Sequence, residues 1–220
     1  MLGIDMKFNP DIHHRRSIRL KGYDYSQVGA YFVTICAYNR ECLFGEIVEM
    51  SGENLGENVR ENLGERENMG ERRSPLREMI VNDLGRIVAA EWIHSAEIRA
   101  EIELGEFVVM PNHFHGIVLI TDDTRIDEKQ RRGDRPVAQM PVVQMSGPQQ
   151  KSIGALLSGF KSAVTKRINE TRNSPGVPVW QRNYHEHVIR NDADYNRIAE
   201  YVAYNPQRWI EDKLHPDNIV

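Results

Sequence analysis

One stretch of the chain constrains the fold most strongly, because two runs of β-forming residues flank a very short turn. The runs Glu103–Met110 and His113–Ile120 are separated only by Pro111 and Asn112. The second run ends in the apolar and β-branched segment Gly116–Ile120, which is typical of a buried strand. The sequence therefore predicts an antiparallel hairpin that turns at Pro111-Asn112.

Two histidines occupy alternate positions in the second of these strands. Residues i and i+2 of a strand point to the same face, so His113 and His115 are expected side by side, with Phe114 facing the core. Two neighbouring imidazoles can bind one divalent metal ion. The triplet alone is equally compatible with two ordinary histidines at a strand end.

Hydrophobic periodicity predicts the remaining elements. They are strands at 31–37 and 44–48, helices at 76–99 and 152–171, extended segments at 179–181 and 187–189, and a last helix from Asn191 or Asp192 to about Asn205. Ser152 is the expected N-cap of the second helix, and Pro206 limits the last one. This order predicts an α+β fold, an antiparallel sheet with helices mainly on one face.

Two segments interrupt this pattern. Residues 52–73 carry an irregular repeat of the type Glu-Asn-Leu-Gly-Glu, with too few apolar residues to bury and frequent glycine, which opposes a helix. We expect a surface insertion there and an irregular loop at 122–150. The expected organisation is a single domain over residues 15–210 that these two segments interrupt.

Composition narrows the function classes. No apolar run approaches the roughly 18 residues of a membrane span, and the first twenty residues have no apolar core of a signal peptide. Cys36 and Cys42 lie outside any zinc spacing, so we expect a cytoplasmic protein with reduced thiols and no membrane partner. The net charge of −4 argues mildly against nucleic-acid binding. Residues 151–208, however, contain nine Lys/Arg and only five Asp/Glu. That segment is compatible with phosphate binding, or simply with solvated helices.

The last predicted helix carries a second group of candidate site residues. Tyr201 and Asn205 are four residues apart and share one helix face. A tyrosine hydroxyl can be a covalent nucleophile when a metal or a base lowers its proton affinity, and an amide oxygen could complete a His-His-Asn metal site. Packing against the core is the alternative role for the tyrosine. Tyr184 and Tyr204 are competing nucleophile candidates.

Three motifs together resemble a known protein family. They are Pro111–Gly116, Trp180–Asn191 and Glu200–Pro206. In this order they resemble the single-tyrosine HUH transposases, in particular the REP-associated tyrosine transposases, over roughly residues 15–48 and 76–210. The resemblance implies a ferredoxin-like α+β domain.

The resemblance also implies a chemistry. His113, His115 and Asn205 match the metal ligands of the family, with Mg²⁺ or Mn²⁺ as the expected ion, and Tyr201 matches its nucleophile. The implied reaction is cleavage of single-stranded DNA through a 5′-phosphotyrosine, followed by strand transfer. The expected partner is single-stranded or hairpin DNA, and the protein is expected to be a monomer or a homodimer.

The expected DNA-binding residues lie in the basic segment. They are Lys161, Lys166 and Arg167 on the second helix, and Arg182 and Arg190 beside the tryptophan motif. Trp180 either stacks on an unpaired base or packs in the core. Two other functions remain open: a catalytically silent protein that binds DNA hairpins, and an unrelated His-x-His metal-dependent hydrolase. The second leaves the motif at 180–190 unexplained.

Overall fold

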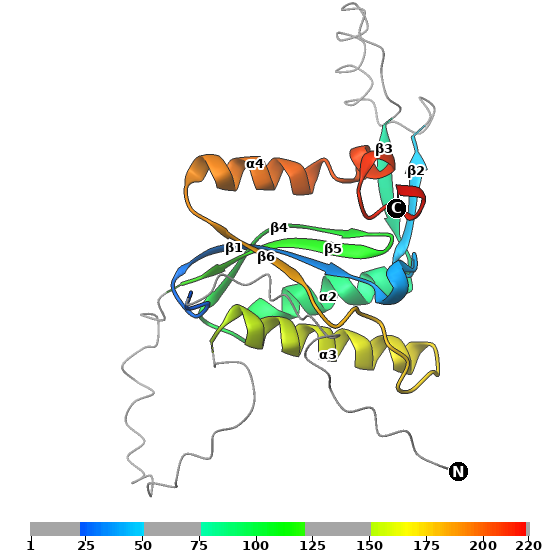
Figure 1. Ribbon diagram of the computed structural model, residues 1–220. Coiled ribbons are helices and arrows are strands. Elements are labelled where there is room, and N and C mark those ends of the chain that lie inside the picture. Colours follow the sequence, from blue (N-terminus) through cyan, green and yellow to red (C-terminus); the bar gives the residue numbers. More distant parts are fainter. Residues whose placement is uncertain (1–22, 51–75, 122–150, 219–220) are drawn as a thin grey trace, which may run out of the picture.

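A four-stranded antiparallel sheet forms the centre of the molecule. The computed structural model describes residues 23–50, 76–121 and 151–218. The strands are β1 (Gly29–Cys36), β4 (Ile102–Met110), β5 (His113–Ile120) and β6 (His185–Ile189), in the spatial order β4-β5-β1-β6. The hairpin predicted around Pro111-Asn112 is β4-β5 (Figure 1). The insertion expected at 52–73 and the loop expected at 122–150 lie outside the described residues.

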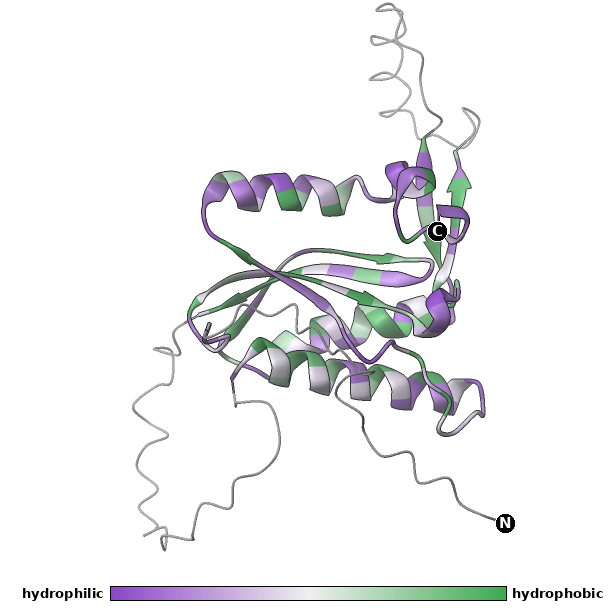
Figure 2. Cartoon of the chain, viewed as in Figure 1, coloured by the Kyte–Doolittle hydropathy of each residue, from purple (hydrophilic) through white to green (hydrophobic). Residues whose placement is uncertain are grey.

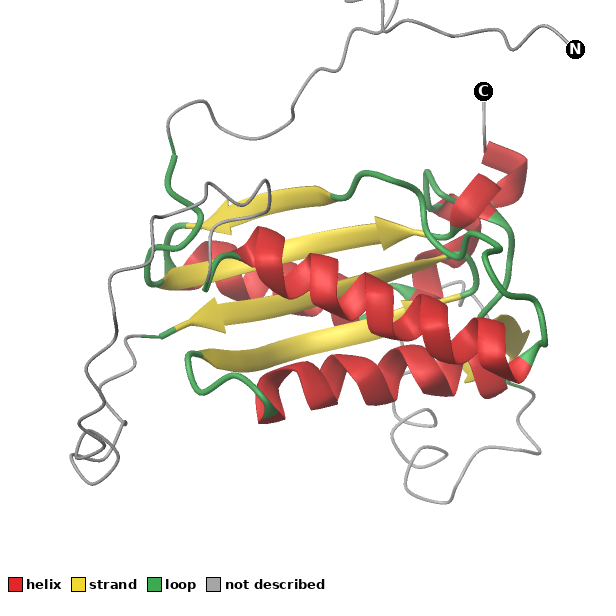
Figure 3. Cartoon of the chain, turned by 90° about the horizontal axis from the view of Figure 1, so that it is seen from below, coloured by secondary structure: helices red, strands yellow, loops and turns green. Residues whose placement is uncertain are grey.

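Three long helices cover the two faces of this sheet. Helices α2 (Asp83–Glu97) and α3 (Ile153–Thr171) lie side by side on one face, as Figure 3 shows. Helix α4 (Asp192–Ala203) lies on the opposite face (Figure 1). The chain order β1-α2-β4-β5-α3-β6, with β1 and β4 separated by β5, is the ferredoxin-like split βαβ arrangement. The predicted α+β fold with most helices on one face is confirmed.

Alternation along β5 separates two hydrophobic layers. Phe114 faces α2 and α3, where its ring lies 4.7 Å from that of Trp92, which in turn lies 5.2 Å from Phe160. Ile117 faces the other way and packs with Ile198 and with other apolar residues beneath α4. Figure 2 shows hydrophobic residues along the strands and a more hydrophilic β6 at the edge of the sheet. The sheet is therefore buried on both faces, and a polar edge remains.

The helix predicted over 76–99 is wrong in its first part. Residues Arg77–Val81 form β3, which pairs with β2 (Gly45–Glu49) in a separate two-stranded sheet. Met79 lies opposite Ile47 in this pairing, and this long-range partner outweighs the local helical periodicity. The helix begins only at Asp83, because the Asn82 side chain accepts a hydrogen bond from the Gly85 N–H at 2.9 Å.

The other helix starts agree with the prediction. Ser152 caps α3 by accepting from the Ala155 N–H at 3.2 Å, and Asn191 caps α4 by accepting from the Asp194 N–H at 2.8 Å. After α4, Pro206 starts the 3₁₀ helix η3 (Pro206–Glu211), which turns the chain back toward the sheet. In the described part of the chain, no helix is long and apolar enough to span a membrane.

An ion pair joins α2 and α3, the two helices that lie on the same face of the sheet. Arg167 on α3 donates a hydrogen bond to the carboxylate of Glu91 on α2, and Glu91 is buried. Lys166, which precedes Arg167 in the sequence, is exposed, and its Nζ lies 4.0 Å from Glu170 Oε1 on the same helix. These adjacent cations therefore have different roles in stability, because only one of them neutralises a buried carboxylate.

We predict that Arg167→Ala lowers the free energy of unfolding by about 1–3 kcal/mol, because it leaves the buried Glu91 carboxylate without its partner. Lys166→Ala is the matched control and should change stability by about 0.5 kcal/mol or less. Urea unfolding followed by circular dichroism measures both. Equal effects of the two substitutions would contradict this account of the α2–α3 contact.

Candidate active site

The two histidines of β5 lie side by side on the face that α4 covers. Their ring centroids are 4.5 Å apart, and both side chains are buried. They are neighbours because i and i+2 of a strand share a face, and Phe114 between them fills the opposite core. The structure thus has the arrangement of imidazoles that the sequence pattern predicts.

The side chain of Asn112 fixes the orientation of His113. Its carbonyl oxygen lies 2.8 Å from His113 Nδ1, and its amide nitrogen donates to the backbone oxygens of Arg40 at 3.2 Å and Leu214 at 2.7 Å. Because the amide nitrogen is used as the donor, the carbonyl oxygen must accept from Nδ1–H. His113 Nε2 is left unprotonated, buried and without a hydrogen-bond partner among the described residues.

His115 contacts the candidate nucleophile directly. Its Nδ1 lies 2.8 Å from Thr34 Oγ1, and its Nε2 lies 3.3 Å from the hydroxyl of Tyr201. The ring also stacks on Phe32, with centroids 5.3 Å apart. Packing against Phe32 and the bond to Thr34 hold the imidazole in place, so that Nε2 faces α4 and its tyrosine.

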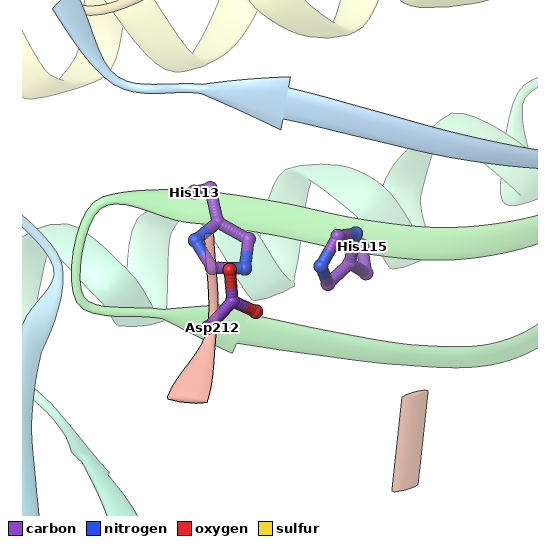
Figure 4. Close-up of side chains that lie close together, drawn as sticks. All are labelled: His113, His115 and Asp212. Atoms are coloured by element: carbon purple, nitrogen blue, oxygen red, sulfur yellow. The ribbon is translucent and has the colours of Figure 1, made fainter. Parts of the chain in front are cut away.

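A third possible ligand comes from Asp212, directly after η3. One ligand atom each of His113, His115 and Asp212 lie within 4.8 Å of one another, and Figure 4 shows the carboxylate turned toward the His113 ring. Asn205 is buried beside them, and its amide nitrogen donates to Asp212 Oδ2 at 3.4 Å. The carbonyl oxygen of Asn205 has no partner among the described residues. Two imidazole nitrogens and one carboxylate oxygen therefore lie close together, with the Asn205 amide beside them.

Burial dominates the protonation of this group. It lowers the pKa of His113 to about 4, although the neighbouring Asp212 carboxylate and Asn205 amide act in the opposite direction. It also lowers the pKa of His115 well below its usual value, and the neighbouring histidines add to this effect. Both imidazoles are thus neutral, the form that binds metal. Burial, with help from Asp212, raises the pKa of the Tyr201 phenol, so that it stays protonated at neutral pH.

A cleft of about 1560 Å³ opens from this group along the polar edge of the sheet. Strands β1, β5 and β6 and helices α3 and α4 all contribute to its walls. The basic residues that line it are Lys161, Arg182, Arg197, Arg208 and Lys213, and the acidic ones are Glu211 and Asp212. The cleft is therefore electropositive apart from the region of Asp212 and could hold an anionic chain.

The residues predicted to bind DNA are divided between this cleft and other places. Arg182 and Lys161 line the cleft, and the Lys161 ammonium donates to the backbone oxygens of Gln181 at 2.6 Å and Arg182 at 3.0 Å. Arg190 is exposed just beyond β6. The structure does not bring Lys166 or Arg167 to the cleft, because these residues pair with carboxylates on the helical face.

Trp180 is part of the core. Only 7% of its surface is exposed, and its ring lies 5.0 Å from that of Phe44 and 6.0 Å from that of Phe160. Its backbone forms an isolated bridge with Ala37. Trp180 was expected either to stack on an unpaired base or to pack in the core, and in the structure it packs in the core.

The three candidate tyrosines have different positions. Tyr201 is half-buried, with its hydroxyl against His115. Tyr204 is the C-cap of α4 and is 53% exposed. Tyr184 lines the cleft just before β6. Of these contacts, the 3.3 Å distance from the Tyr201 hydroxyl to His115 joins a candidate nucleophile to a candidate metal ligand.

Comparison with known proteins gives one relative of high similarity. The chain is 37% identical over 214 residues to an uncharacterized protein of Haemophilus influenzae strain Rd, covering 96% of this chain and 98% of the relative. The chain belongs to the family of that protein. No family model matches the sequence.

Two solved structures are similar to the chain over most of its length. One is a REP-associated tyrosine transposase bound to a REP hairpin, with a TM-score of 0.45, 15% identity and 92% of both chains covered. The other is a candidate transposase of Deinococcus radiodurans R1, with a TM-score of 0.33, 14% identity, and 84% of this chain and 95% of that chain covered.

The buried imidazole of His113 should make the fold sensitive to acid. Its pKa is about 4 in the folded protein and about 6.5 in an unfolded chain. Between these values the unfolded chain binds the extra proton, so stability falls as the pH is lowered through this window. The predicted loss for this residue between pH 7 and pH 4.5 is roughly 2–3 kcal/mol.

Urea unfolding with a chelator present, at pH 7 and pH 4.5, measures this loss. In His113→Gln, which cannot titrate, the loss of stability over the same interval should be smaller by that amount. The same pH dependence in the wild type and the variant would contradict the assignment of a neutral, buried His113.

Proposed function

We propose that this protein is a metal-dependent DNA strand-cleaving and strand-transfer enzyme that uses Tyr201 as its nucleophile. The observation that carries the proposal is the hydroxyl of Tyr201 at 3.3 Å from His115 Nε2, beside a buried group of possible metal ligands. The three sequence motifs that resemble the single-tyrosine HUH transposases support it.

The side chains present fit a divalent ion. His113 Nε2 is a buried nitrogen without a hydrogen-bond partner among the described residues, and the same is true of Asn205 Oδ1. Such buried atoms are unfavourable unless something binds them. The Asp212 carboxylate supplies a negative charge, and mixed imidazole and oxygen ligands suit Mn²⁺ or Mg²⁺. We propose His113, His115, Asp212 and Asn205 as the residues that hold the ion, with Asn112 and Thr34 orienting the two imidazoles.

A bound divalent ion would polarise the scissile phosphate and offset charge in the transition state. The residues of this chain do the rest. Tyr201 supplies the phenolic oxygen that attacks phosphorus, which forms a 5′-phosphotyrosine and releases a 3′-hydroxyl. Because the pKa of this phenol is raised, the free protein does not hold a ready phenolate. Arg208, which also lines the cleft, weakly opposes this rise in the pKa of Tyr201 and can stabilise negative charge near it.

The cleft favours a flexible anionic chain as the substrate. Its basic residues share the cleft with Tyr201, whereas Arg167 on the α2–α3 side of the sheet is paired with Glu91. Single-stranded DNA can bend into such a groove more easily than a stiff duplex. One of the structurally similar proteins is bound to a REP hairpin, so a hairpin with a single-stranded flank is the substrate that we propose.

We predict that Tyr201→Phe abolishes the covalent protein–DNA adduct, because it removes the attacking oxygen and keeps the ring that packs under α4. The measurement is a denaturing gel after incubation with labelled hairpin DNA and Mn²⁺. Hairpin affinity should change by less than about threefold, since phosphate contacts provide most of it.

Tyr204→Phe and Tyr184→Phe are the controls for this experiment, and both should retain the adduct. An adduct that persists in Tyr201→Phe and is lost in either control would identify another nucleophile. The absence of any adduct in the wild type, combined with salt-sensitive hairpin binding, would favour the catalytically silent alternative.

We predict that Asp212→Asn weakens Mn²⁺ binding at least tenfold, because it removes the only negative charge proposed among the ligands. Glu211→Gln is the matched control, since Glu211 is the adjacent carboxylate and lines the same cleft. Isothermal titration calorimetry with Mn²⁺ in the absence of DNA compares the two variants. Equal losses would mean that overall charge matters more than coordination.

A further inference from the structure

A third imidazole lies across the sheet from the metal-ligand group. In the strand register, Thr34 of β1 is opposite His115 on one side and opposite His185 of β6 on the other. The three side chains therefore form one row on the face that α4 covers. Two strand spacings separate His115 from His185, roughly 10 Å. The cleft described above is lined by all three of these residues and by Tyr201.

Several other groups that line the cleft are already engaged or cannot transfer a proton. His187 Nε2 lies 2.8 Å from Asp194 Oδ2, and Lys161 donates to two backbone oxygens. Arg182 and Arg197 carry guanidinium groups, which do not release protons in proteins. His115 is bonded through both ring nitrogens. Among the described residues, His185 makes no hydrogen bond or ion pair with its ring, although that ring lines the cleft.

The proposed reaction needs a proton at the leaving oxygen. When the phenolic oxygen of Tyr201 bonds to phosphorus, the bond from phosphorus to the 3′-oxygen breaks and that oxygen must take up a proton. In-line displacement places the leaving oxygen on the side of phosphorus away from the attacking tyrosine. With the phosphodiester placed along this row and Tyr201 attacking from the His115 end, the leaving oxygen lies toward β6 and His185.

We propose that His185 is a further catalytic residue, which donates a proton to the 3′-oxygen as the strand is cleaved. The phenol proton of Tyr201 leaves to water in the open cleft. In the rejoining step the neutral imidazole takes the proton from the attacking 3′-hydroxyl, the 3′-oxygen bonds to phosphorus, and Tyr201 leaves with a proton from water. This role rests on the proposed function.

The environment of His185 suits both directions of this transfer. Burial lowers the pKa of His185, and His187 on the same strand adds to this effect. The charged and titratable groups that line the same cleft are His115, Lys161, Arg182, Tyr184, His187, Arg197, Tyr201, Arg208, Glu211, Asp212 and Lys213. A bound phosphate brings negative charge and favours the protonated imidazole before cleavage. After the transfer, the neutral imidazole is left beside the 3′-hydroxyl.

A substrate with sulfur in place of the bridging 3′-oxygen tests this assignment, because a thiolate leaves without a proton. Single-turnover cleavage of the oxygen and the sulfur hairpin is measured for the wild type and His185→Gln, with Mn²⁺ in every reaction. We expect His185→Gln to slow cleavage of the oxygen substrate by about 10²–10³-fold. It should cleave the sulfur substrate within about threefold of the wild-type rate.

His187→Gln is the matched control, two residues along the same strand face, and should affect both substrates equally. Equal slowing of both substrates in His185→Gln, or no slowing of either, would overturn the assignment. If the wild type forms no adduct with either substrate, the proposed function fails instead, and the two failures are thus distinguished.

Discussion

The buried amide of Asn112 connects the parts of the molecule on which the site depends. Its carbonyl oxygen accepts from His113, and its nitrogen donates to Arg40 and to Leu214. These bonds join the β4–β5 turn to the segment after β1 and to the loop after η3. Asp212 belongs to the same loop, where its carboxylate accepts from the Leu214 N–H at 2.7 Å. A single side chain thereby sets the tautomer of one imidazole and places the carboxylate beside it.

Helix α4 brings the nucleophile to the same place by a second set of contacts. Its apolar residues Ile198 and Val202 pack on Phe32 and Ile117 of the sheet. At its N-terminal end, Tyr195 donates to Glu106 of β4 at 2.9 Å, and Asp194 bonds to His187 of β6. The helix is thus attached to both edges of the sheet, and its last turn holds Tyr201 over His115. The candidate nucleophile on α4 and the candidate ligands on β5 and after η3 therefore meet within one domain.

Local patterns were sufficient for much of this arrangement. Alternation along 113–120 predicted the strand and the shared face of the two histidines, because period-two patterns are set by backbone geometry alone. Ser152 and Asn191 identified their helix starts by capping chemistry. The four-residue spacing of Tyr201 and Asn205 predicted a common helix face. Helix α4 ends at Ala203, so Asn205 lies beyond it, and both residues line the cleft. These features depend on residues close in sequence, and so they can be read from it.

Features that depend on distant contacts were missed. Asp212 reaches His113 only because η3 reverses the chain after Pro206. The spacing of residues in the sequence does not predict such a turn. A loop carboxylate soon after the Asn205-Pro206 break was the only available signal. Strand β3 forms because β2 is there to pair with it. Arg167 was expected on the DNA surface, yet α2 supplies a buried carboxylate for it. A sequence shows which residues are charged, but it does not show which residue of another element will neutralise each charge.

The central claim is that one divalent ion binds between β5 and the loop after η3, next to Tyr201. Anomalous scattering from Mn²⁺ in crystals of the protein tests it most directly. The account predicts one strong peak within coordination distance of His113 Nε2, His115 Nε2 and a carboxylate oxygen of Asp212, with Asn205 as a further oxygen ligand. Manganese bound only elsewhere, with the His113–His115 pair free of metal, would contradict it.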